Sequence, residues 1–280
     1  MIWQTSRRRI GVDRVLIMAI LNTTPDSFSD GGLISGIDDA VRRAEKLIAE
    51  GADVLDIGGE STRPGSARVL VDEEIRRVIP VIEGIAKRFD VPISVDTSKA
   101  AVGKAAIDAG AEILNDISGL RFDAEIGEIA ARSKTGLILM HSRGEFETMH
   151  RQEPVEDILS EVSGSFQAAI AKAESFGVAA ERIVLDVGIG FGKTPEQNLE
   201  LIARLGKLTE AFPQFPILVG TSRKSFIGRI LNDAPVDKRL PGSLASVVVA
   251  VWNGAKIVRV HDVKDTADAV RTVEAIKAEL

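Results

Sequence analysis

Hydrophobic stretches rich in β-branched residues recur eight times along the chain, and each one stops at a polar side chain. Most of these stretches are followed by a segment with apolar residues three or four positions apart, as on one face of a helix. Strands and helices that alternate in this way predict an α/β fold, and eight repeats predict a (β/α)₈ TIM barrel. The polar stops are Asn22, Asp56, Asp96, Asn115, His141, Asp186, Ser222–Lys224, and Arg259 with His261.

Parallel barrel strands bring their carboxyl ends to one rim, where barrel enzymes carry their chemistry. The polar stops are therefore candidates for a single site, although they are spread over most of the chain. Long Gly-, Ser- and Pro-rich loops follow the first and second predicted strands, and we expect both loops to be flexible. The segment of residues 1–14 is short and polar, which predicts an N-terminal hairpin or lid. We expect residues 1–280 to form a single domain.

Composition narrows the class of protein. The 280 residues are 45% hydrophobic and 27% charged, enough to bury a large core. A net charge of −6 without a basic, aromatic-rich patch argues against nucleic-acid binding. The absence of Cys excludes disulfide and thiolate chemistry. Without an apolar stretch of about 18 residues or a signal-peptide core, we expect a cytoplasmic protein that does not contact a membrane.

Four strand-end residues suit a planar heterocycle with alternating amino, ring N–H and carbonyl groups. They are Asp96, Asn115, Asp186 and Lys224. Carboxylates accept hydrogen bonds, an amide donates and accepts, and an ammonium group donates. Each Asp alone could instead cap a helix, but several barrel strands that end in this way favour a shared site.

A second set is cationic. Arg63 lies in the loop after the second strand, and Arg259 and His261 end the eighth. Arg and His side chains donate to phosphate or carboxylate oxygens, so these residues predict an anion site. The alternative for Arg259 is a surface ion pair with a nearby acid such as Asp262.

Two loops add further candidates. The loop from Asn22 to Gly32 is long enough for a lid, and the Asn22 amide oxygen suits one contact to a phosphate-bound Mg²⁺. Residues 188–194 (GIGFGKT) fall one position short of the phosphate-loop pattern GxxxxGK[ST]. We therefore expect this turn to approach a ligand closely with its backbone, with Phe191 as an aromatic wall.

The remaining polar and apolar features predict structural roles. We expect Met140 to pack in the barrel core, His141 to bind no metal and His150 to be solvated. Asp56 is expected to support the second loop. The helix near Ser243–Trp252 is apolar almost all round, which predicts either burial or contact with a second subunit.

The chain closely resembles the dihydropteroate synthases from about residue 15 to its end. The shared motifs are LNTTPDSFSDGG (21–32), GADVLDIGGESTRPG (51–65), ISVDTSKA (93–100), AEILNDISG (111–119), LMHSRG (139–144), GIGFGKT (188–194), LVGTSRKSFIG (218–228) and IVRVHDV (257–263). The resemblance implies a TIM barrel, usually a homodimer, that is a sulfonamide target. It implies condensation of 6-hydroxymethyl-7,8-dihydropterin diphosphate with p-aminobenzoate in folate biosynthesis, assisted by Mg²⁺.

The resemblance also implies a role for each candidate residue. Asp96, Asn115, Asp186 and Lys224 would bind the pterin; Thr62, Arg63, Arg259 and His261 the diphosphate; Phe28, Arg63, Pro64, Phe191 and Ser222 the p-aminobenzoate; and Asn22 the Mg²⁺. Catalysis would rest on Arg63, Lys224, Arg259 and His261. The cationic groups would stabilise the charge of the departing diphosphate in a dissociative displacement.

Some residues depart from the family pattern: Thr23, Val187, Ser142 and the pair Glu145-Phe146. These departures put loop conformation and inhibitor affinity in question rather than the reaction. Two other classes stay open, a methyltetrahydrofolate-dependent methyltransferase and a non-catalytic pterin-binding paralogue. A nucleotide-dependent kinase would need the complete phosphate loop that this chain lacks.

Overall fold

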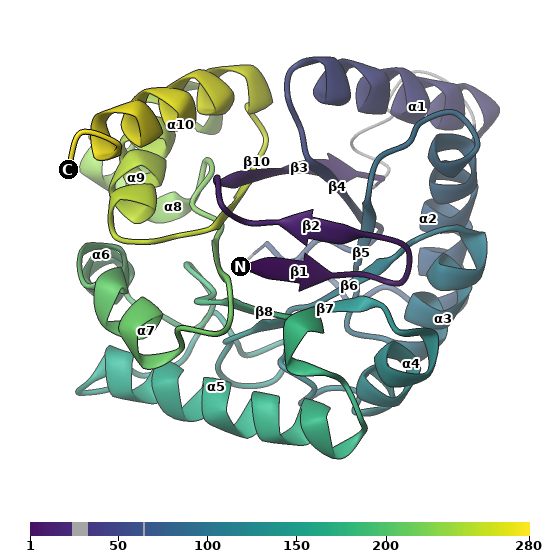
Figure 1. Cartoon of the computed structure of the whole chain (residues 1–280), viewed down its shortest axis with the longest axis horizontal. Helices are drawn as coiled ribbons and strands as arrows, with labels where there is room; N and C mark the ends of the chain where they lie inside the picture. The colour runs from purple at the N-terminus through teal and green to yellow at the C-terminus, as the bar shows by residue number, and fades with distance from the viewer. Residues whose placement is uncertain (24–32, 64) are drawn as a thin grey trace.

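The computed structural model describes residues 1–23, 33–63 and 65–280. Eight parallel strands close into a barrel in the order β10-β3-β4-β5-β6-β7-β8-β9, and helices surround it (Figure 1). The predicted TIM barrel is therefore confirmed. The barrel strands are β3 (Leu16–Asn22), β4 (Val54–Gly58), β5 (Ile93–Asp96), β6 (Ile113–Asp116), β7 (Gly136–Met140), β8 (Ile183–Asp186), β9 (Ile217–Val219) and β10 (Ile257–Val260).

The helices form the outer layer. They are α1 (Leu33–Ala49), α2 (Val71–Ala86), α3 (Ala100–Ala109), α4 (Glu125–Ser133), α5 (Ile158–Ser175), α6 (Pro195–Ala203), α7 (Leu205–Ala211), α8 (Ser225–Ile230), α9 (Leu240–Trp252) and α10 (Val263–Lys277), with short 3₁₀ turns η2 (Ala180–Arg182) and η3 (Val236–Lys238). Local sequence sets some of their ends. Helix α6 begins with a capping box, in which Thr194 and Gln197 satisfy each other's backbone N–H groups.

The two faces of each strand have separate partners, because side chains alternate along a strand. One face packs against the helices, and the other fills the barrel interior. The inner cluster includes Val54, Ile113, Val184 and Ile257. The residues two positions further along are, in the same order, Asp56, Asn115, Asp186 and Arg259. Alternation therefore turns these four polar side chains inward, at the end of the barrel where the strands finish.

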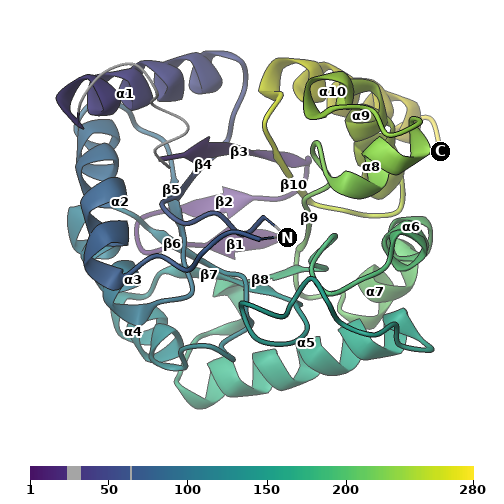
Figure 2. The same ribbon diagram turned by 180° about the vertical axis from the view of Figure 1, so that it is seen from behind.

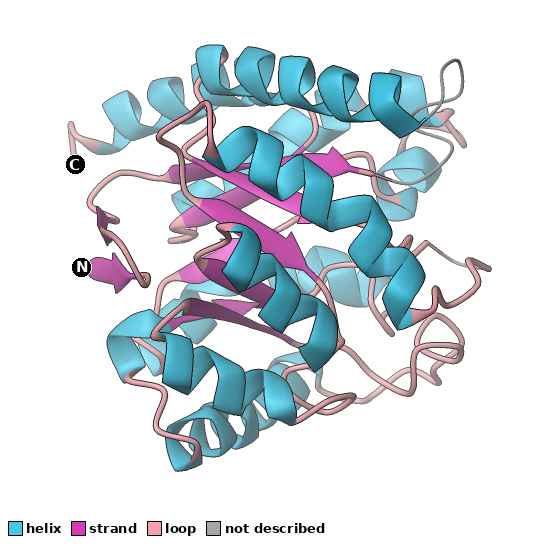
Figure 3. Cartoon of the chain, turned by 90° about the vertical axis from the view of Figure 1, so that its right-hand side faces the viewer, coloured by secondary structure: helices cyan, strands magenta, loops and turns pink. Residues whose placement is uncertain are grey.

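An N-terminal hairpin closes the opposite end of the barrel, where the strands begin (Figure 3). Strand β1 (Ile2–Gln4) pairs antiparallel with β2 (Arg9–Gly11). Trp3 is completely buried in the inner cluster, and its Nε1 donates to the Arg182 carbonyl oxygen at 3.0 Å. Thr5 Oγ1 donates to Glu112 Oε2 at 2.5 Å. The hairpin lies at the far end of the barrel from the polar strand ends and does not cover them.

Helix α9 has one buried face and one exposed face. Val247, Ala250 and Val251 are buried, whereas Val249 and Trp252 are 43% and 45% exposed. In the described part of the chain, no helix is both long enough and apolar enough to span a membrane.

We expect Trp3→Ala to lower the free energy of unfolding by about 3–5 kcal/mol, because it leaves a cavity at the closed end of the barrel. Ile2→Ala is the matched control in the same strand, where the side chain is 42% exposed. It should change the free energy of unfolding by about 0.5 kcal/mol or less. Urea unfolding of both variants makes the comparison, and equal losses would contradict the role assigned to Trp3.

Candidate active site

The carboxyl ends of the barrel strands form a polar rim on the face seen in Figure 2. The strand register aligns Asn22 with Gly58, Gly58 with Asp96, and Asp96 with Asn115. Gly58 contributes no side chain, so its neighbours approach each other across it. Asn22 Oδ1 and Asp96 Oδ2 each lie 3.8 Å from the point that a Cβ on Gly58 would occupy.

Arg259 points inward from β10 and binds two carboxylates. Its Nε donates to Asp56 Oδ2 at 2.6 Å, and its Nη2 donates to Asp96 Oδ2 at 2.6 Å. Asn115 Nδ2 donates to the same Asp56 oxygen at 3.1 Å. The Asp56 side chain is fully buried, and those of Arg259 and Asp96 are 20% and 15% exposed. A charge so far from water needs opposite charges beside it, and this network supplies them.

The structure corrects two predictions about these residues. Asp56 does not support the second loop, because its carboxylate binds Arg259 and Asn115 inside the barrel. The surface pair of Arg259 with Asp262 is also wrong. Asp262 binds Arg223 instead, with 2.9 Å between Asp262 Oδ2 and Arg223 Nε.

Burial and neighbouring charges together set the pKa values of Asp96, Asp186 and Arg259 in the rim. It raises the pKa of Asp96 to about 7, against the attraction of Arg259 and with further repulsion from Asp56. Burial alone would lower the pKa of Arg259, but Asp56 and Asp96 outweigh it and raise the pKa above its ordinary value. Burial also raises the pKa of Asp186, which Lys224 opposes. Near neutral pH, Arg259 is therefore charged, while Asp96 exchanges between its two forms.

The turn after β8 is held by its own lysine. Lys193 Nζ donates to the carbonyl oxygens of Gly188 at 2.7 Å, Phe191 at 3.0 Å and His141 at 3.3 Å. Asp186 Oδ1 accepts from the Gly188 N–H at 2.8 Å. Gly188 has φ +64°, and a Cβ there would lie 1.8 Å from the His141 carbonyl oxygen. The lysine and the glycine thus serve the shape of this turn rather than a phosphate-binding loop.

This turn brings Phe191 against Lys224. Lys224 Nζ lies 4.9 Å from the centre of the Phe191 ring and donates to the Ile189 carbonyl oxygen. Burial lowers the pKa of Lys224 to about 8, which Asp186 opposes. Gly190 has φ +85°, which favours glycine, and a Cβ there would lie 3.3 Å from Lys224 Cδ. An ammonium group and an aromatic wall therefore stand together at the rim.

His261 and Ser222 bind each other. Ser222 Oγ lies 3.1 Å from His261 Nδ1 and accepts from the His261 N–H at 3.2 Å. Burial, together with the nearby cations Arg259 and Arg223, lowers the pKa of His261 to about 3. Because the serine oxygen accepts the backbone proton, its own proton can go to Nδ1. That arrangement leaves the proton of the neutral imidazole on Nε2.

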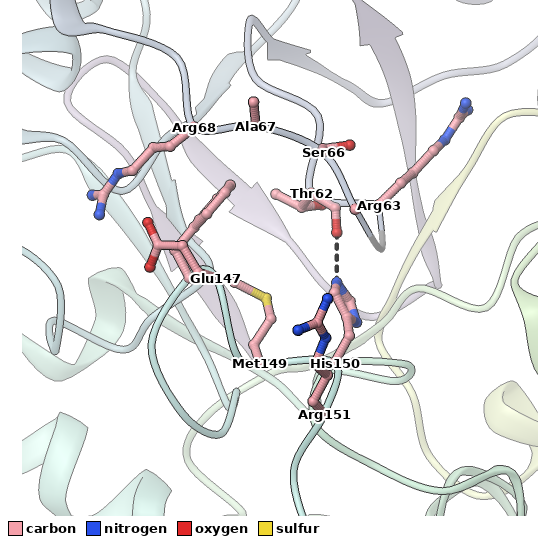
Figure 4. Close-up of a pocket in the computed structure, with 11 residues that line it drawn as sticks. Thr62, Arg63, Ser66, Ala67, Arg68, Glu147, Met149, His150 and Arg151 are labelled. Carbon is pink, nitrogen blue, oxygen red and sulfur yellow. Dashed lines mark hydrogen bonds between the residues drawn. The ribbon is translucent and has the colours of Figure 1, made fainter.

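The loop after β4 borders a cavity of about 560 Å³ (Figure 4). His150 Nε2 lies 2.8 Å from the Thr62 carbonyl oxygen, and the His150 ring packs against Phe191 with 5.8 Å between centroids. His150 is therefore half-buried and in contact with two rim loops, rather than surrounded by solvent alone. The Arg63 side chain is exposed and extends away from His150 in the view of Figure 4. Local sequence gave no sign of the His150 contact, which joins residues 88 positions apart.

Met140 and His141, at the end of β7, have different surroundings. Met140 packs in a cluster of Ile117, Phe146 and Met149 beneath the rim loops, rather than in the inner cluster of the barrel. The His141 ring is buried, which lowers its pKa to about 2, and it has no hydrogen-bond partner among the described residues. Its carbonyl oxygen is the part that contacts the turn after β8.

Some predicted residues cannot be placed. Phe28 and Pro64 lie outside the described residues, as does most of the loop after β3. Within residues 1–23, 33–63 and 65–280, no group of three or more His, Asp or Glu side chains has the geometry of a metal site. Asn22 would therefore need oxygen ligands from a bound substrate to hold Mg²⁺.

Comparisons with known proteins identify the family of this chain. A family model described as pterin binding enzyme matches residues 18–261. The dihydropteroate synthase of Escherichia coli K12 is 50% identical over 92% of this chain and 90% of its own length. That of Bacillus subtilis is 45% identical over 94% of this chain and 89% of its own length.

Solved structures of dihydropteroate synthases are also similar to this chain. Xanthomonas albilineans dihydropteroate synthase with 4-aminobenzoic acid has a TM-score of 0.92 at 40% identity, covering 99% of this chain and 98% of that one. The Yersinia pestis enzyme with a sulfonamide drug complex has a TM-score of 0.92 at 42% identity, covering 99% and 100%. The Burkholderia cenocepacia enzyme with 7,8-dihydropteroate has a TM-score of 0.89 at 42% identity, covering 99% and 97%.

Proposed function

This chain belongs to the family of pterin-binding enzymes and acts as a dihydropteroate synthase, and we propose how its rim residues divide that reaction. The enzyme is a transferase of folate biosynthesis. It joins the methylene carbon of 6-hydroxymethyl-7,8-dihydropterin diphosphate to the amine of p-aminobenzoate and releases diphosphate. The observation that carries the proposal is the buried network of Arg259 with Asp56 and Asp96, which leaves acceptors and donors at the mouth of the barrel.

The pterin set is Asp96, Asn115, Asp186 and Lys224. Asp96 uses only one carboxylate oxygen on Arg259, and the buried Asn115 Oδ1 has no partner among the described residues. A buried acceptor without a partner is costly, so these oxygens suit the N–H groups of a pterin. Lys224 donates to a ring nitrogen or carbonyl oxygen from the side of Phe191. The ionised carboxylates also stabilise positive charge on the pterin methylene as its bond to diphosphate stretches.

The diphosphate set is Thr62, Arg63, Arg259 and His261. Arg259 stays charged throughout the working pH range because two carboxylates hold its proton. His261 acts as a neutral donor through Nε2, because Ser222 occupies Nδ1. Arg63 contributes a guanidinium group on a long, flexible side chain from the loop after β4, and the Thr62 hydroxyl donates beside it. The C–O electron pair leaves with the diphosphate, and these donors oppose its growing charge.

The p-aminobenzoate set is Phe28, Arg63, Pro64, Phe191 and Ser222. Phe191 supplies a wall for the aryl ring and Arg63 a donor for the carboxylate. The Ser222 hydroxyl is already bonded to His261, so its part is to link the two substrate sites. The neutral arylamine uses its own lone pair to form the C–N bond and then loses a proton. No strong general base is needed, and placement of the amine is the main requirement.

Magnesium would be held by the Asn22 amide oxygen together with diphosphate oxygens, and it would supply further positive charge to the leaving group. Asn22 faces Asp96 across Gly58, so a cation there would also lie beside a carboxylate.

The cytoplasmic location stays a prediction.

We also propose a homodimer formed through the face of α9. Ala245, Val249 and Trp252 are exposed and lie three or four residues apart, which makes one apolar stripe. Ile230 on α8 and Ile276 on α10 are 56% and 55% exposed. Scattered apolar residues are ordinary on a surface, but a continuous stripe indicates a partner.

The reaction is tested by diphosphate release from the pterin diphosphate with Mg²⁺, with and without p-aminobenzoate. We expect release to be faster with the arylamine, to be matched by formation of 7,8-dihydropteroate, and to slow when EDTA removes the metal. A release rate that ignores the arylamine would overturn the assignment. A methyltransferase or a non-catalytic paralogue would form no 7,8-dihydropteroate.

Pterin affinity should depend on the protonation of Asp96. Its pKa is raised to about 7, so the carboxylate that accepts pterin N–H groups exists above that pH and is lost below it. For a pterin analogue that does not itself titrate, affinity should fall about tenfold between about pH 8 and about pH 6. Asp96→Asn should bind weakly and without this slope in calorimetric titrations. An equal slope in the variant would assign the titration to another group.

The dimer is tested by light scattering after size-exclusion chromatography. Val249→Glu places a charge in the apolar stripe and should shift the wild-type dimer to a monomer, because burying an unpaired charge is costly. Lys264→Glu is the control, since this α10 side chain is 60% exposed and pairs with the exposed Asp268. A wild-type monomer, or a Val249→Glu dimer of unchanged affinity, would refute this interface.

A further inference from the structure

A buried ionic triad lies at the base of the loop after β4. Lys99 Nζ lies 2.8 Å from Glu60 Oε1 and 2.5 Å from Glu74 Oε2. The side chains of Lys99, Glu60 and Glu74 are 9%, 6% and 0% exposed. Each comes from a different segment: Lys99 precedes α3, Glu60 follows β4, and Glu74 belongs to the first turn of α2. The triad therefore joins three neighbouring units of the barrel.

The triad contributes little to the free energy of unfolding, because its charges do not balance. Two carboxylates share one ammonium group away from water, and Glu74 Oε1 has no partner among the described residues. Burial raises the pKa of Glu74, against its bond to Lys99. Apolar replacements of buried ion pairs are often neutral or stabilising, so such a group is better explained by the geometry that it imposes. The geometry here concerns the loop after β4.

Glu60 closes the base of that loop. Its Oε1 accepts from the Val69 N–H at 2.5 Å, so one carboxylate joins both ends of the segment 61–68. On the same side, Arg77 Nη1 donates to the Gly59 carbonyl oxygen at 2.9 Å. A Cβ on Gly59 would lie 2.8 Å from Val78 Cγ1, so the loop rests directly on α2. The segment so closed carries Thr62 and Arg63.

Lys99 connects this base to the pterin set. It stands three residues after Asp96, at the extended position before α3, and its N–H donates to Thr97 Oγ1 at 3.3 Å. The short, buried path from Asp96 to Lys99 leaves the ammonium group little freedom relative to the end of β5. Because Lys99 binds Glu60, the position of the Glu60 carboxylate is fixed relative to the end of β5 at Asp96.

We propose that Lys99 is a positioning residue for the condensation, which holds Glu60 and, through it, the segment of Thr62 and Arg63 at a fixed place relative to Asp96. This inference rests on the roles proposed above for Thr62, Arg63 and Asp96. Lys99 touches neither substrate. Its contribution is to keep the loop that serves the arylamine and the diphosphate in register with the residues that bind the pterin.

Lys99→Met keeps a side chain of similar length and removes the charge that holds Glu60. We expect kcat to fall about tenfold or more, since small misplacements of reacting groups are costly. The KM for p-aminobenzoate should rise, while the Kd of a pterin analogue stays within about twofold, because Asp96, Asn115, Asp186 and Lys224 are untouched. Lys104→Met is the matched control on α3, where the side chain is 69% exposed and should leave all three constants unchanged.

A wild-type kcat and KM in folded Lys99→Met would overturn the inference. So would a pterin affinity that falls in step with kcat, because that result indicates general damage rather than misplacement of the loop. Circular dichroism establishes whether the variant is folded. If it is not, Glu60→Gln replaces it: the amide oxygen still accepts from Val69, but the charge facing Lys99 is gone. The same division between kcat and pterin Kd is expected, and wild-type kinetics would refute the proposal.

Failure of the proposed function would look different. It would appear in the wild-type protein, as diphosphate release that does not respond to p-aminobenzoate. Failure of the inference about Lys99 would leave the wild-type reaction intact and appear only in the variants.

Discussion

A guanidinium group removed from water must have its charge matched nearby, and Arg259 is matched by carboxylates from two other strands. Its partners are Asp56, in the middle of β4, and Asp96, at the end of β5, while Arg259 itself belongs to the last strand of the barrel. The network therefore spans the mouth of the barrel rather than one βα unit. Because Asp56 also accepts from Asn115, four strands share one arrangement of charges. The proposed pterin set and the proposed diphosphate set meet in this network.

The arrangement also explains why protonation differs between neighbouring side chains. Asp96 lies between a cation that favours its charged form and a burial that opposes it, and burial has the larger effect. Asp262 raises the pKa of His261, but burial and the cations Arg259 and Arg223 outweigh it, so the pKa falls to about 3. One rim thus holds a permanent cation, a carboxylate that titrates near neutrality and a neutral imidazole donor. This combination suits a reaction in which opposite charges develop on two parts of one substrate.

Sequence reasoning was strong where the barrel's own periodicity decides the outcome. Asp96, Asn115, Asp186 and Arg259 end strands, and side-chain alternation alone directs them inward. It was weak where the partner is remote: Asp56 has the same inward position, but nothing near it in the chain identifies Arg259 as its partner. The contacts of His150 and Lys193 are not predictable from sequence, because both side chains bind backbone carbonyl oxygens, which have no signature in the sequence. The contacts of Lys99 with Glu60 and Glu74 are not predictable for a related reason, since the three residues are far apart in the chain.

The N-terminal hairpin has a consequence for how this enzyme can be joined to other proteins. Trp3 seals the end of the barrel where the strands begin, and Met1 lies on that same side (Figure 3). A domain fused ahead of residue 1 would hang from the sealed end and leave the open mouth clear for substrates. Its tether would also begin beside a buried anchor, because Met1 is only two residues from Trp3. Tension on such a linker would therefore act first on the side chains that fill the barrel beside Trp3, and only afterwards on the residues of the rim.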